Sequence, residues 1–220
     1  MEKYLPMLKK TQLFAGIGEG EIRGMLHCLG ARPATYKKGE YLLRQGEHVS
    51  EMLLVAEGVL HVQQDDYWGN RSILTSIGAG EMFGEGCAAS AGSVLLNDVV
   101  AAEDSTVIFF NVKKMLTTCS SACRFHTMVV QNLFYAISEK NRKLMQKLEH
   151  ISKRTTREKL ISYLSEEAKK QNSAHFTIPF NRQQLADFLS VDRSAMSAEL
   201  SKMRDEGLLE FNKNRFQLIE

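Results

Sequence analysis

The sequence predicts an α+β protein in three parts: an N-terminal β-roll, one long helix, and a C-terminal pair of short helices followed by a hairpin. Two observations carry this prediction. Short apolar runs separated by turn residues extend from about residue 31 to 112, and a helical stretch without proline or glycine runs from Arg124 to Ile151. The expected boundaries are 1–118 for the roll, 119–152 for the long helix and 153–220 for the C-terminal domain.

The N-terminal part has the rhythm of an all-β roll or sandwich, because its apolar runs end at turn residues about every ten positions. The run Val59–Gln63 alternates before a polar turn at Asp65–Asp66, and Thr106–Phe110 closes the series with β-branched and aromatic residues. Residues 13–29, which precede the roll, have the pattern of a helix. We therefore expect a β-roll with a helical cover.

The charges are distributed unevenly along the chain. Residues 1–110 hold 9 Lys and Arg against 14 Asp and Glu, whereas residues 111–220 hold 19 against 12. An acidic front half and a basic back half indicate that any polyanionic partner binds to the back half.

The composition is that of an ordinary globular protein, with 44% hydrophobic and 25% charged residues. The start of the chain lacks the apolar core of a signal peptide, and no stretch approaches about 18 consecutive apolar residues. The cysteines are too few and too irregularly spaced for a secreted disulfide framework, so we expect a soluble, cytoplasmic protein. The four cysteines are Cys28, Cys87, Cys119 and Cys123.

Apolar residues recur every seven positions along the long helix, at Val130, Ile137, Leu144 and Ile151. Such a repeat favours a partner helix, because a long isolated helix needs an apolar surface to pack against. The alternative is a helix that packs only on its own domain. We predict dimerisation through this stripe, which Asn141 interrupts at a point where it could fix the register. The residues that flank the stripe are Leu133, Phe134 and Leu148.

The last forty or so residues have the pattern of a helix-turn-helix. They follow an amphipathic helix expected at 155–170 and a short strand at 176–180. Asn181 is placed to cap one helix, and Asp192 to cap a second helix that ends near Gly207. The residues expected to face the core are Leu185, Ala186, Phe188, Leu189, Ala195, Met196, Leu200 and Met203.

In a helix-turn-helix the second helix enters the major groove, and its N-terminal side chains meet the base edges. Arg193 is the natural bidentate donor to guanine O6 and N7. Residues 208–219 have the pattern of a hairpin, whose Lys213 and Arg215 are placed where a wing would meet phosphate. The candidate DNA-binding residues are Arg182, Arg193, Ser194, Ser197, Lys202, Lys213 and Arg215.

In order and spacing, these motifs resemble the CRP/FNR superfamily of bacterial transcription regulators over nearly the whole chain. The resemblance implies a cyclic-nucleotide-binding-type β-roll, a long dimerisation helix and a C-terminal winged helix-turn-helix. It further implies a homodimer on a pseudo-palindromic DNA operator, with RNA polymerase as a candidate partner and an effector in the roll. The segments that carry the resemblance are Lys38-Gly39-Glu40, Gln45-Gly46-Glu47, Gly58, Gly80–Glu85, Arg182–Ala186 and Val191–Ser194.

The chain departs from the family pattern where cyclic nucleotides are held. Members that bind them keep an Arg-Ser pair about ten residues beyond the loop glutamate, but this chain has Leu95-Leu96-Asn97-Asp98 there. A phosphate near Asp98 and Glu85 would be repelled without that arginine. The family's purine-contacting polar pair is also missing from residues 141–144, so we expect an effector other than cyclic AMP. The candidate effector-binding residues are Gly84, Glu85, Gly86, Leu96, Asn97 and Asn141.

The sequence assigns no cofactor. An iron–sulfur cluster needs four thiolates, and only Cys28 lies near the N-terminus, where oxygen-sensing relatives cluster theirs. Cys119, Cys123 and His126 fall on one face if helical, a spacing compatible with a metal or redox site. The favoured interpretation is thiols without such a role, because free cysteine behaves as a small apolar residue. Haem ligation through His61 or His126 has no local support.

We therefore expect a DNA-binding transcription regulator and no enzyme. No phosphate-binding loop or hydrolase motif is present, and His48 and His61 are too few for a metal-dependent β-roll enzyme. The alternative is a sensing or scaffolding module that acts through protein contacts, but such a module would not need exposed cations at Arg193, Lys213 and Arg215. Position 198 is Ala where relatives often carry a second arginine, so the operator is expected to differ from the family's best-known consensus.

Overall fold

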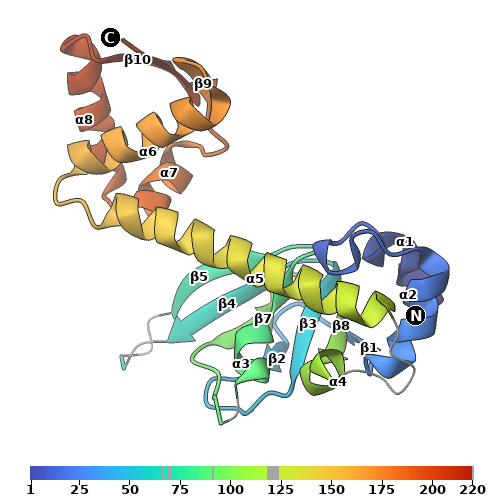
Figure 1. Ribbon diagram of the computed structural model, residues 1–220. Helices are drawn as coiled ribbons and strands as arrows, with labels where there is room; N and C mark the ends of the chain where they lie inside the picture. The colour runs from blue at the N-terminus through green and yellow to red at the C-terminus, as the bar shows by residue number, and fades with distance from the viewer. Residues whose placement is uncertain (66, 69–70, 91, 118–123, 220) are drawn as a thin grey trace. The chain divides into compact units, whose positions relative to one another are not determined.

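The computed structural model describes residues 1–65, 67–68, 71–90, 92–117 and 124–219 (Figure 1). The chain divides into two compact units, Met1–Ile137 and Ser138–Glu220. This division falls inside the long helix, so the helix is shared by both units instead of forming a unit of its own. None of the described helices combines the length and the apolar character needed to cross a membrane.

The first unit contains the β-roll, built from two four-stranded antiparallel sheets in the orders β1-β8-β3-β6 and β2-β7-β4-β5. Because successive side chains of a strand point to opposite faces, Leu53 and Val55 of β3 face the core between the sheets. Met52 and Leu54 point to the opposite side of this sheet, into a second apolar core that lies between the sheet and the helices that cover it, called here the outer core. The strands are β1 Arg32–Tyr36, β2 Tyr41–Leu43, β3 Glu51–Glu57, β4 Leu60–Asp65, β5 Arg71–Ile77, β6 Met82–Phe83, β7 Asp98–Ala101 and β8 Ser105–Asn111.

Helices cover the outer face of the sheet that contains β3 and β8, which confirms the predicted helical cover. Phe14 packs on Phe110 of β8 with their ring centroids 5.9 Å apart, and both side chains are fully buried. This apolar layer ties the N-terminal segment to the roll. The helical elements are η1 Glu2–Tyr4, α1 Leu5–Leu8, η2 Gln12–Phe14, α2 Glu19–Cys28, α3 Glu85–Ala89 and α4 Val112–Leu116.

The long helix α5 runs over Arg124–Ile151. Its first half has a buried face, in which Val129, Leu133 and Ala136 pack into the outer core of the first unit. Leu133 therefore does not flank the outer stripe as predicted: it lies four residues after Val129, on the face that contacts its own domain. The predicted stripe lies on another face. There Phe134 is 73% exposed, Leu144 is 65% exposed and Ile137 is 37% exposed.

The second unit contains the predicted helix-turn-helix and hairpin. Helix α6 covers Thr156–Gln171, α7 covers Arg182–Leu189 and α8 covers Arg193–Asp205. The three-stranded sheet has the order β10-β11-β9, with Phe176 and Phe216 stacked beneath it. Ala195 is exposed and not in the core as predicted, because the buried face of α8 carries Met196, Leu200 and Met203, spaced four and three apart, and Ala195 lies on another face. The strands are β9 His175–Thr177, β10 Leu209–Asn212 and β11 Arg215–Leu218.

Candidate functional site

The start of the helix-turn-helix is fixed by local capping. The side chain of Asn181 accepts from the Gln184 backbone N–H (2.9 Å), and Gln184 Oε1 accepts from the Asn181 N–H (2.8 Å). This capping box satisfies two backbone donors that the first turn of α7 would otherwise leave without partners. At the other end of α7, Ser190 adopts a left-handed conformation (φ 52°) and turns the chain toward α8.

A lysine outside the motif holds this turn. Lys159 Nζ on α6 donates to the carbonyl oxygens of Leu189 and Ser190, at 3.2 and 3.3 Å. These carbonyls lie at the end of α7, where a helix has backbone acceptors to satisfy and where a cation is favourable. Lys159 therefore helps to set the direction in which the second helix leaves the turn. The sequence gives no signal for this contact, because thirty residues separate the partners.

The N-terminus of α8 presents the predicted readout residues. The Asp192 carboxylate accepts from the Ala195 backbone N–H (2.8 Å) and from the Ser194 hydroxyl. These hydrogen bonds lower the pKa of Asp192, with the Ser194 hydroxyl as the largest cause. Arg193 and Ser194 are exposed, whereas Ser197 is half-buried and donates to the Arg193 carbonyl oxygen (2.9 Å). The helix therefore begins with an exposed guanidinium and two hydroxyl groups close to one another.

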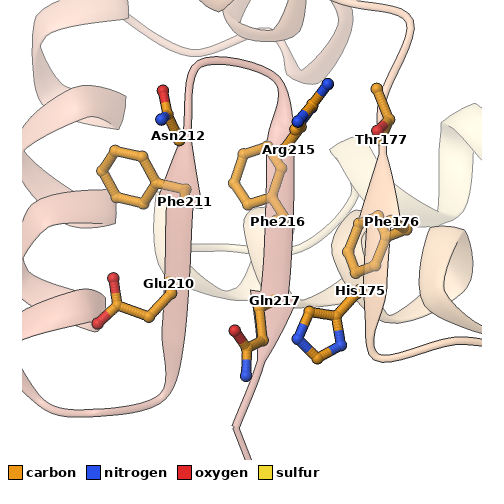
Figure 2. A pocket seen from close by; sticks show the side chains of 9 residues that line it. All are labelled: His175, Phe176, Thr177, Glu210, Phe211, Asn212, Arg215, Phe216 and Gln217. Carbon is orange, nitrogen blue, oxygen red and sulfur yellow. The ribbon is translucent and has the colours of Figure 1, made fainter.

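The hairpin forms a wing with its cations near the turn. Asn212 and Arg215 pair across β10 and β11, so Lys213 and Asn214 make a two-residue turn. Lys213 is exposed and adopts a positive φ of 55°. The Asn214 side chain donates to the Ile178 carbonyl oxygen (3.1 Å), which ties the turn to the segment before α7. Arg215 lies between Asn212 and Thr177 on the exposed face of the sheet (Figure 2).

That face of the sheet is hollowed over about 410 Å³. Two rows of polar side chains cross it, and Arg215 belongs to the row nearer the turn (Figure 2). The second row consists of Glu210, Gln217 and His175. The two rows place a carboxylate and a guanidinium on neighbouring strands, so the face has mixed charge.

Arg182 has a different environment from the other predicted cations. Its guanidinium lies over the rings of Phe211 and Phe216, at 4.7 and 5.1 Å from the ring centroids. Burial lowers its pKa, and Nη2 makes no hydrogen bond within the part of the chain that the structure describes. Cation–π stacking of this kind joins the first residue of α7 to the wing. Lys202, by contrast, is exposed near the end of α8.

The candidate effector residues of the roll differ strongly in exposure. Gly84 has a positive φ of 85°, which glycine adopts without strain, and it turns β6 into α3. Glu85, the first residue of α3, is only 8% exposed, whereas Leu96 is 70% exposed. Asp98 accepts through Oδ1 from the Gln45 backbone N–H (2.8 Å). Gly86 belongs to α3, and Asn97 is half-buried before β7. Asn141 is not part of the roll: it is exposed on α5, in the second unit.

The cysteine and histidine set that was considered for a metal is only partly placed. Cys119 and Cys123 lie outside the described residues. His126 is buried, and its Nε2 donates to the Lys114 carbonyl oxygen (3.0 Å), which joins α5 to α4. No group of three or more His, Cys, Asp or Glu among the described side chains is arranged to hold a metal ion.

A second buried histidine was missed by sequence reasoning. His150 contacts the Ser162 hydroxyl through Nδ1 (2.8 Å) and the Glu166 carboxylate through Nε2 (2.9 Å). Its ring also meets Tyr163 edge to face. These contacts fasten the last turn of α5 to α6. The sequence carries no pattern for them, because the partners are 12 to 16 residues away on another helix.

Comparison with known proteins gives matches to both units. The profile described as "Cyclic nucleotide-binding domain" matches residues 33–122, and that described as "Crp-like helix-turn-helix domain" matches residues 158–220. A cyclic nucleotide-gated cation channel of Ictalurus punctatus is 35% identical over 82 residues, which cover 37% of this chain and 11% of the channel. The chain thus spans about a tenth of the curated relatives that it matches.

Solved structures match nearly the whole chain. The catabolite activator protein of Thermus thermophilus is 21% identical, with 96% of this chain and 94% of that chain covered and a TM-score of 0.51. A CooA variant from Carboxydothermus hydrogenoformans is 18% identical, with 94% and 88% covered and a TM-score of 0.54. At these identities the likeness shows a common fold.

A sensing β-roll, a long helix and a winged helix-turn-helix in one chain define a transcription regulator with an effector-binding domain and a DNA-binding domain. The two profile matches and the common fold identify the group. The chain belongs to the CRP/FNR family.

Proposed function

We propose that this protein is a homodimeric, sequence-specific DNA-binding transcription regulator, controlled by a small effector other than cyclic AMP. The observation that carries the proposal is the N-terminus of α8, where Arg193 and Ser194 are exposed beyond a capped turn. The same compact unit carries exposed Lys213 and Arg215 on its wing. A helix that reads base edges and a wing that meets phosphate need this distribution of side chains.

Within this proposal the cations have different tasks. Arg193, at the tip of α8, contacts guanine, because its planar fork matches guanine O6 and N7. Lys213 and Arg215 contact phosphate on the wing side, and Lys202 adds positive charge on α8. Arg182 acts chiefly by holding the wing against α7, since its guanidinium stacks on Phe211 and Phe216.

Dimerisation through α5 is supported by the exposed apolar stripe. Phe134, Ile137, Leu144 and Leu148 follow one another at spacings of three, seven and four, and all four are exposed in the single chain. Two copies of this helix would bury the stripe in a coiled coil, with the half-buried Val130 and Ile151 at its ends. Asn141 falls on the same stripe, where a polar residue specifies the register.

The residues of the roll do not fit a cyclic phosphate. A phosphate needs a cation or several N–H donors, and the side chains of Leu96-Asn97-Asp98 supply no cation and only one amide. Asp98 and Glu85 add negative charge to this region. An effector that is neutral or more apolar suits these residues better, with Val94 and Leu96 exposed beside them.

One experiment tests the proposal as a whole. The full-length protein is incubated with a randomised duplex DNA library, and bound sequences are recovered while sedimentation measures its mass. We expect a two-fold symmetric sequence, with half-sites about one helical turn (roughly 34 Å) apart, bound by a dimer. A dimer that enriches no sequence at physiological salt would favour the scaffolding alternative, in which the second unit contacts proteins. RNA polymerase stays a predicted partner.

A further inference from the structure

The two serines at the start of α8 have their hydroxyl protons engaged. The Ser194 hydroxyl donates to Asp192 Oδ1, and the Ser197 hydroxyl donates to the Arg193 carbonyl oxygen (2.9 Å). A serine hydroxyl has a single proton and two lone pairs. With the proton used inside the protein, only the lone pairs remain for a partner outside it.

The bond from Ser194 is held by a carboxylate that has a second task. Asp192 is the N-cap of α8, and the same Oδ1 accepts from the Ala195 backbone N–H. Its depressed pKa keeps this group ionised at neutral pH, so it accepts hydrogen bonds and donates none. A hydrogen bond to a charged acceptor is stronger than one between neutral groups. Turning the Ser194 proton toward DNA would therefore sacrifice the stronger bond.

The bases differ in what they offer to such an acceptor. In the major groove adenine presents the N6 amino group and cytosine the N4 amino group, whereas guanine O6 and thymine O4 only accept. A hydroxyl that can only accept therefore pairs with adenine or cytosine. One turn along the helix, exposed Ala198 brings no polar group that would compete for these bases.

We propose that Ser194 and Ser197 are specificity-determining residues that select major-groove amino groups, next to the guanine contacted by Arg193. This inference rests on the proposed DNA-binding function and adds the base class to it. Adenine and cytosine satisfy the same chemistry, and the experiment separates them. Asp192 is then a positioning residue, because it contacts the Ser194 proton and no base.

The test uses the full-length dimer and the operator recovered from the randomised library. At each contacted position, purine replaces adenine, or pyrimidin-2-one replaces cytosine, so that only the amino group is lost. We expect this deletion to weaken wild-type binding by about three- to tenfold, the range for one hydrogen bond. The operator sequence shows whether adenine or cytosine stands at each position, and a deletion that weakens binding shows that its amino group is contacted. The same deletion should leave the affinity of Ser194→Ala or Ser197→Ala unchanged at the matching position.

Two further variants control the interpretation. Ser152→Ala removes a hydroxyl that also donates to a backbone carbonyl in its own segment, but outside α8, and it should respond to the deletions as the wild type does. Asp192→Asn keeps a good N-cap, because an amide Oδ1 still accepts from the Ala195 N–H, but it replaces the charged acceptor of the Ser194 proton with a neutral one. We expect Asp192→Asn to hold the hydroxyl proton less strongly and so to relax the preference at the Ser194 position toward guanine or thymine.

The outcomes separate this inference from the function on which it rests. If the wild type enriches no sequence, the proposed DNA-binding function fails and the inference fails with it. If a sequence is enriched and needs Arg193, but the wild type prefers guanine or thymine at the serine positions, only the inference is overturned. The same holds if amino-group deletion weakens wild type and serine variants equally, or if Asp192→Asn leaves base preference intact.

Discussion

The two units use α5 in different ways. In the first unit three of its residues, Val129, Leu133 and Ala136, are buried in the outer core of the roll. In the second unit no α5 residue before His150 is buried, although Leu144, Met145 and Leu148 are all apolar. The first half of the helix is thus stabilised by its own domain. The apolar residues of the second half lack such cover in the single chain, and a partner helix would supply it.

The candidate sites of the two units differ in how far apart their residues lie in the sequence. The residues at the start of α8 are positioned by the Asp192 cap, which lies within three residues of its backbone partner in sequence. The candidate effector residues of the first unit come from β6–α3 and from the segment before β7, and they range from buried Glu85 to exposed Leu96. A local site follows from sequence rules, whereas a site assembled from distant segments depends on packing.

The largest expected effect on operator binding concerns the exposed half of α5. Ile137→Asp places a charge in the proposed dimer interface along α5, where it would be buried without an oppositely charged partner. We expect monomers that bind the operator about a hundredfold or more weakly, because two linked half-sites bind far more tightly than one. Tyr135→Asp is the matched control: it adds the same charge on an exposed aromatic residue outside the stripe. Sedimentation measures the oligomeric state, and titration with operator DNA measures the affinity. A wild-type protein that is monomeric and binds the operator with full affinity would contradict dimerisation through α5.

A comparably large effect is expected for cyclic nucleotides in the roll. This chain lacks the phosphate-binding arginine of relatives that bind cyclic nucleotides and carries Asp98 nearby. Its affinity for a cyclic nucleotide should therefore be lower than theirs on the order of a thousandfold. Isothermal titration with cyclic AMP and cyclic GMP should then show no heat at sub-millimolar nucleotide. A micromolar dissociation constant for either would mean that another cation reaches the site.

A smaller effect is expected at the tip of α8. Arg193→Ala should weaken operator binding by about 1–3 kcal/mol and relax the preference at one base pair. Repeating the library selection with the variant measures both changes. Unchanged affinity and unchanged preference would remove Arg193 from base readout and leave the wing as the main source of contact.

The smallest effect is expected at the wing. Lys213→Ala should weaken binding to all sequences by a similar factor and reduce the slope of log affinity against log salt by about one. Titrations of operator and non-specific DNA at several salt concentrations give the slope. A loss confined to the operator would instead give Lys213 a part in base recognition.

The sequence predicted most of the second unit because its signals are local. Asn181 and Asp192 cap the two helices as expected, and the hairpin turns at Lys213–Asn214. Caps and tight turns act through neighbours a few residues away, so composition and spacing reveal them. Leu133 was misplaced for the opposite reason. Its spacing fits the stripe loosely, and only the position of the roll decides that it faces inward.

By itself, the sequence determined the order of the elements, the family resemblance, the basic second half and the candidate readout residues. Only the tertiary structure decided that Arg182 stacks on the wing, that Lys159 holds the helix-turn-helix turn, and that His150 fastens α5 to α6. The physical reason is common to all three. Periodicity and caps are set by bonds along the chain, whereas a cation or an imidazole finds its partner across the fold, at separations that no spacing rule describes.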